Sequence, residues 1–114
     1  MSKANSYNLA FPVFAGYLVT VVFTKNVRKA LKLLGGKGSK NVGACHVTKT
    51  NEPGHAWLIF SPNPDPDVIA HECWHCVYAL LKYAGAKVED EVVAYHLGYA
   101  DGKVHEFLRL EASE

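Results

Sequence analysis

The sequence predicts an α+β fold in which a small antiparallel sheet packs against two consecutive helices. Runs of β-branched and aromatic residues dominate the first 60 residues, and residues 17–23 are the clearest example. Helical periodicity replaces these runs from about residue 67 onward. The chain has 114 residues, of which 49% are hydrophobic and 20% are charged. Such a chain can bury a core as one domain, residues 1–114.

The first half is expected to hold the sheet and one short helix. Residues 1–8 are polar and are expected to lack regular structure. The elements that follow are one or two strands within 11–24, an amphipathic helix over 27–34 with a basic outer side, and strands over 42–48 and 55–60. Turn residues at 50–54 predict that the last two strands form a hairpin.

The second half is expected to be helical. A helix is predicted over 67–83, and Gly85 is placed to end it. A second helix is predicted over 90–100, with Asp101 and Gly102 at its end. Residues 104–110 fit either a short last helix or an edge strand.

Charge is distributed unevenly along the chain. Residues 1–51 contain eight Lys or Arg and no acidic residue, whereas residues 52–114 contain four Lys or Arg and eleven Asp or Glu, giving +8 and −7. Two halves that pack together would neutralise each other, whereas a basic first half left free would suit nucleic acid. The basic residues lack interleaved aromatic side chains, so we rank nucleic-acid binding last. They include Lys25, Arg28, Lys29, Lys32, Lys37 and Lys40.

No membrane segment or secretory leader is expected. The apolar run at residues 9–23 is short for a membrane span and contains Pro12 and Gly16. It also lacks the features of a signal peptide. The three cysteines fit no secreted disulfide scaffold. We therefore expect a cytoplasmic protein.

The segment His71-Glu72-Cys73-Trp74-His75 is the strongest functional signal. At 100° per residue the two histidines lie about 40° apart and one turn apart, so both imidazoles can reach one ion, most plausibly zinc. Glu72 lies about 100° from His71, which suits contact with a water rather than with the ion. Cys73 and Cys76 fall on the opposite, apolar face, so we expect them in the core.

A catalytic zinc needs a third protein ligand, which we expect from the second helix. Glu91 is preferred because it lies in the first turn, with Tyr95 one turn later. His96 is the next candidate, and Asp90 and Glu89 are also possible. We expect His46, His55 and His105 to be surface or strand residues.

With Glu91 and the following Ala94-Tyr95, this segment resembles the zincin metallopeptidases of the gluzincin type. It is also similar to small His-Glu-x-x-His proteins of bacteriophages, over about residues 55–101. The resemblance implies zinc ligands His71, His75 and Glu91, with Glu72 as the catalytic base. We expect Tyr95, or one of the remaining histidines, to donate to the oxyanion. The resemblance also implies a peptide substrate paired with strand 55–60, and a host cytoplasmic location for a phage protein.

Two functions follow from these residues. The first is a zinc peptidase in which Glu72 activates the attacking water. The alternative is a zinc-stabilised protein that binds and modulates a host factor without catalysis.

Overall fold

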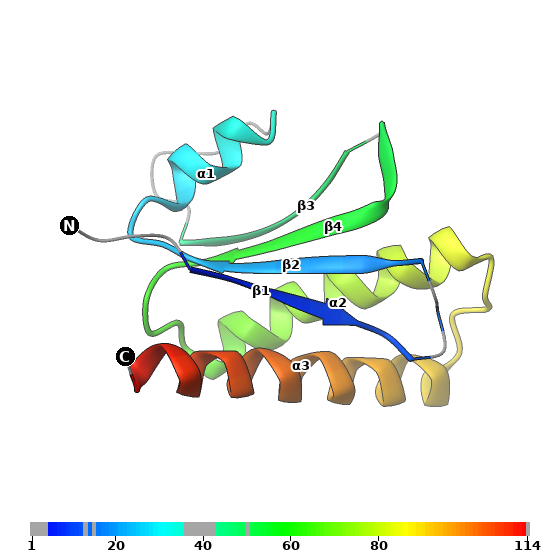
Figure 1. Ribbon diagram of the computed structural model, residues 1–114. Coiled ribbons are helices and arrows are strands. Elements are labelled where there is room, and N and C mark those ends of the chain that lie inside the picture. The colour runs from blue at the N-terminus through cyan, green and yellow to red at the C-terminus, as the bar shows by residue number, and fades with distance from the viewer. Residues whose placement is uncertain (1–4, 13, 15, 36–42, 50, 114) are drawn as a thin grey trace.

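A computed structural model describes residues 5–12, 14, 16–35, 43–49 and 51–113 of the chain. Four strands and three helices occupy this part, and Figure 1 shows their arrangement. They are β1 (Asn5–Ala10), β2 (Leu18–Phe23), α1 (Val27–Leu33), β3 (Ala44–Lys49), β4 (Glu52–Phe60), α2 (Pro66–Ala84) and α3 (Asp90–Ala112). The α+β class is therefore confirmed.

The sheet is mixed, not antiparallel as predicted. Its strand order is β1-β2-β4-β3, and β2 pairs with β4 in parallel while the other two pairings are antiparallel. The predicted hairpin forms from β3 and β4, but its second strand lies inside the sheet. Leu58, Ile59 and Phe60 of β4 are all fully buried. A strand that is apolar on both faces gains most from a central position, which places β4 beside β2.

Two layers of helix enclose the sheet. The chain packs α1 on one face, where Val27 and Leu31 contact Val47 and Ile59. The other face carries α2 and α3, which lie side by side and run in opposite directions (Figure 1). The outer side of α1 is basic, with Arg28, Lys29 and Lys32 exposed, whereas Lys37 and Lys40 lie outside the described residues.

The expectation for the N-terminus was wrong from Asn5 onward. Residues 5–10 form β1, in which Tyr7 and Leu9 face inward while Ser6 and Asn8 are exposed. Tyr7 Oη donates a hydrogen bond of 2.8 Å to Glu111, and Asn5 donates one of 3.1 Å to the same carboxylate. Long-range contacts with α3 therefore stabilise a polar edge strand. One or two strands were predicted within 11–24, and among the described residues of that range Leu18–Phe23 form one strand, β2.

The helix boundaries follow local chemistry except in α3. Pro66 occupies the first turn of α2, and Gly85 ends it in the left-handed conformation with φ 69°, as predicted. Asp101 and Gly102, in contrast, do not end α3, which continues to Ala112. Ala100 and Val104 are buried on one face across this point, so packing on the sheet maintains the helix. Across the described residues, helices of the length and apolarity needed to cross a membrane are absent.

Candidate metal centre

The histidine pair lies on the exposed face of α2. His71 and His75 are both exposed, and their Nε2 atoms are 3.2 Å apart. Two nitrogens bound tetrahedrally to one zinc at 2.0–2.1 Å stand about 3.3 Å apart. The pair therefore fits two neighbouring positions of a zinc site, although a neutral pair at this distance can also share a proton.

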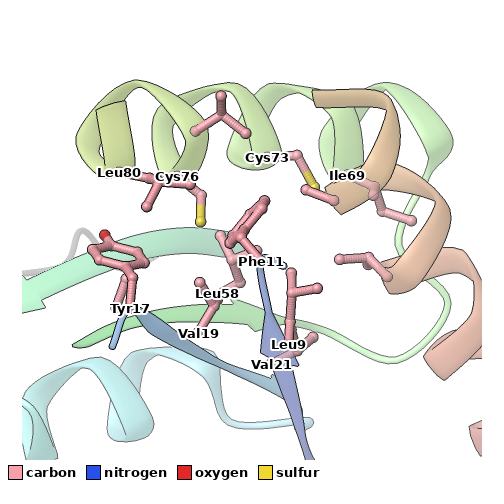
Figure 2. Close-up of a cluster of buried hydrophobic side chains, with 14 of the residues drawn as sticks. Leu9, Phe11, Tyr17, Val19, Val21, Leu58, Ile69, Cys73, Cys76 and Leu80 are labelled. Atoms are coloured by element: carbon pink, nitrogen blue, oxygen red, sulfur yellow. The ribbon is translucent and has the colours of Figure 1, made fainter. Parts of the chain in front are cut away.

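The opposite face of α2 forms the core. Cys73, Cys76 and Leu80 are fully buried and project toward Val19 and Leu58 of the sheet (Figure 2). Burial raises the pKa of both thiols, that of Cys76 to about 12. A thiol that stays protonated is a poor metal ligand. Both cysteines are therefore core residues, as predicted, and all three cysteines of the chain are free.

Glu72 lies on the side of α2 that faces β3. The side chain is half-buried and lines two shallow hollows. One is bounded by Ala44, Ser61 and Val68, and the other also contains His71. Burial, and then the charge of Glu72, raises the pKa of Cys45 on β3 to about 11. Glu72 thus lies beside the start of β3 and next to His71, and its side chain is partly open to solvent.

A third histidine, His46 of β3, lies beside the pair. Its ring is nearly parallel to that of His75, at 12°, with ring centroids 6.4 Å apart. Nε2 of His46 is buried and has no hydrogen-bond partner in the described part of the chain. Burial, and then His75, lowers the pKa of His46 to about 4. A buried nitrogen without a hydrogen-bond partner lowers the free energy of unfolding by about 1–3 kcal/mol, so such atoms are rare in folded proteins and call for an explanation.

Sequence reasoning placed His46 among the surface or strand histidines, and it is a strand residue. What it missed is the direction of the side chain. Ala44 packs with the core under α2, whereas Cys45 and Val47 pack with the cluster under α1. Because side chains alternate along a strand, His46 faces α2. The inward position within the predicted strand 42–48 was the available signal.

The residues predicted on α3 lie away from the pair. Burial and Cys76, and then the charge of Asp101 on α3, raise the pKa of the Cys73 thiol. Glu91 lies ten residues before Asp101 (101 − 91), about 15 Å along the helix. Within the described ranges, no group of three or more His, Cys, Asp or Glu side chains is arranged to hold a metal ion. The structure therefore brings His71 and His75 together without Glu91, and the same helix start carries Glu89 and Asp90.

Tyr95 and His96 of α3 also contact residues other than the histidine pair. Tyr95 is 61% exposed, and its ring packs edge-on against His96. His96 is buried, donates from Nδ1 to Val92 O at 2.9 Å, and contacts the ring of Phe14 at 5.0 Å. His96 is thus part of the packing between α3 and the segment after β1. His55 Nε2 is hydrogen-bonded to Thr20 Oγ1 at 2.7 Å, and His105 Nε2 lies 3.7 Å from Asp101 Oδ2.

The open edge of the sheet nearest the pair is β3. The strand predicted to pair with a peptide, residues 55–60, belongs to β4. β4 already pairs with β2 on one edge and with β3 on the other, so neither edge is open to a peptide. Among the described strands, β3 pairs with β4 on one side and with none on the other. Any peptide added beside α2 would pair with β3.

Comparison with family models, with curated proteins and with solved structures finds no match for this chain. Its own residues therefore carry the functional argument.

Proposed function

We propose that this protein is a zinc-dependent hydrolase of peptide bonds, with the metal held by His71 and His75. The observation that carries the proposal is the 3.2 Å separation of the two Nε2 atoms on an exposed helix face. A bound zinc ion supplies a water of lowered pKa and polarises the substrate carbonyl.

Glu72 is the general base in this proposal. Its carboxylate lies one residue from the first ligand and lines the hollows on that side of α2. From there it accepts the proton of the attacking water and returns that proton to the leaving amine. A site that only stabilised the fold would have no use for a carboxylate that is held open to a ligand.

The free edge of β3 supports an extended peptide as substrate. Backbone groups at a sheet edge pair with an added strand whatever its sequence, and neighbouring hollows select its side chains. The hollow lined by Ala44 and Glu72 lies at the start of β3. A peptide bound there would pass directly over the proposed base. Glu91 as third ligand and Tyr95 as oxyanion donor stay predictions from the sequence.

The test combines metal content with cleavage. Purified wild type, Glu72→Gln and His71→Gln are analysed for zinc and incubated with a peptide mixture read by mass spectrometry. We expect Glu72→Gln to keep zinc and to lose cleavage by about 100-fold or more. His71→Gln is expected to lose both. Glu106→Gln, an exposed glutamate of α3, is the matched control and should retain both. Wild type without zinc, or cleavage unchanged in Glu72→Gln, would refute the proposal.

One observation favours a non-enzymatic alternative. The hollows at Glu72 are shallow, and exposed aromatic rings stand beside the pair: Trp74 stacks on Tyr78 at 5.2 Å and is 44% exposed. Exposed aromatic side chains are typical anchors of protein interfaces. A zinc-stabilised protein that binds a partner through this face would keep zinc, show no cleavage in wild type, and lose partner binding on Trp74→Ala.

A further inference from the structure

Three histidines from two elements lie on one side of α2, but no group of three in the described residues is placed so that it could hold a metal ion. His71 and His75 come from the helix, and His46 comes from β3. We propose that His46 is the third protein ligand of the zinc site, in place of Glu91. This inference rests on the proposed metal site and names a ligand that the sequence pattern does not contain.

The first support is the unpaired nitrogen of His46. The Nε2 atom of a histidine either accepts a hydrogen bond or donates one, depending on the tautomer. In His46 this atom is buried and has no partner among the described residues. The position is one where the strand alternation calls for an apolar side chain, as at Ala44. Coordination of an ion by Nε2 would satisfy this atom.

The second support is distance. The ring centroids of His71 and His75 are 4.8 Å apart, and those of His46 and His75 are 6.4 Å apart. Two imidazoles that share a tetrahedral zinc have centroids about 5 Å apart. The first pair already meets this value, and the second exceeds it by little more than 1 Å. His75 is exposed, so its ring can rotate toward His46 without displacing the core.

The third support is the flank of α2 on which the histidines lie. Angles of 100° per residue place His75 and Glu72 on one flank of α2. Glu72 lines one hollow together with Ala44 of β3, and His75 lies beside His46 of the same strand. β3 therefore borders the histidine side of α2.

The chemical result is a three-histidine site with a fourth position for water. With three neutral imidazoles the site would keep the full charge of the ion, whereas a carboxylate ligand would lower the charge of the site by one unit. Ligation by His46 would also link β3, the proposed peptide-binding edge, directly to the metal.

The experiment measures zinc affinity by competition with a chelating dye, using the full chain freed of metal. The variants are His46→Leu, His46→Gln, Glu91→Gln and the matched control His55→Gln, a histidine of the same sheet that is already hydrogen-bonded. Residues that only support a ligand change affinity by about 10–100-fold. We expect both His46 variants to lose more than about 100-fold, and Glu91→Gln and His55→Gln to stay within about threefold of wild type.

Cobalt substitution provides a readout that a structural role would not change. Four-coordinate Co²⁺ absorbs visible light strongly, and we expect the wild-type spectrum to change in both His46 variants and not in Glu91→Gln. Circular dichroism and thermal unfolding of the metal-free variants verify folding. Wild-type affinity in the His46 variants, with loss in Glu91→Gln, would overturn the role of His46 and leave the proposed function intact. A wild type that binds no zinc, or binding unchanged in His71→Gln, would overturn the metal site itself.

Discussion

Replacement of His46 by leucine should stabilise the metal-free protein at neutral pH. Nε2 of His46 is buried without a partner in the described residues, and such a group costs about 1–3 kcal/mol. Leucine has a similar volume and no polar atom, and the strand position faces the apolar core beside α2. We expect the free energy of unfolding to rise by about 1 kcal/mol or more. In a chain of this length that raises Tm by about 4 °C.

The same substitution should remove part of the acid sensitivity. The pKa of His46 is lowered to about 4, whereas the unfolded chain titrates near its ordinary value of about 6.5. Between these values the unfolded state binds more protons, so stability falls as the pH falls. At about 1.4 kcal/mol per pH unit, His46 accounts for up to about 3 kcal/mol of lost stability by pH 4. His46→Leu should lose correspondingly less over this interval.

Urea denaturation followed by circular dichroism measures both effects, at pH 7 and at pH 5 with a chelator present. His55→Leu is the matched control, because it breaks the 2.7 Å bond to Thr20 and should lower stability by about 1 kcal/mol. The reasoning fails if His46→Leu is less stable than wild type at pH 7, or if both proteins lose stability equally on acidification.

Three further predictions concern the scaffold of the site. Leu80→Ala should lower the free energy of unfolding by about 3 kcal/mol, because its side chain is fully buried between α2 and the sheet; an unchanged urea midpoint would contradict the core assignment. Gly85→Ala should cost about 1 kcal/mol because its φ of 69° is strained for other residues, and a Tm that does not fall argues against this cap. In the native protein a thiol reagent should label only Cys45, and slowly, because its pKa is raised to about 11; fast labelling of Cys73 would show that α2 is not packed as described.

Local chemistry made the helices predictable, and long-range packing decided the sheet. Pro66 and Gly85 mark the ends of α2 by their own backbone preferences, so the prediction erred by one residue at each end. The polar strand β1 was missed because its stability comes from Glu111, about a hundred residues away. The parallel pairing of β2 and β4 depends on which strand is buried on both faces, and turn signals do not report that.

The candidate site, like the fold, has one part that local sequence predicts and one part that depends on long-range packing. His71 and His75 are four residues apart on one helix, so periodicity alone predicted that they meet. The third position requires knowledge of which element borders that side of α2. The prediction assumed that α3 does so near its first turn, but α2 continues nine residues beyond His75 (84 − 75), and this length carries Glu91 away from the pair.

The two candidate third ligands predict different responses to zinc, beyond affinity. Ligation by His46 would join β3 to α2, elements that already contact each other, so zinc should stabilise the fold with little change in helix packing. Ligation by Glu91 would require α3 to shift relative to α2, which would disturb the hydrogen bonds of Tyr7 and Asn5 to Glu111 of α3. Hydrogen exchange of β1 with and without zinc distinguishes these cases. Protection of β1 that is unchanged by zinc fits His46, whereas loss of that protection would require the ligand from α3.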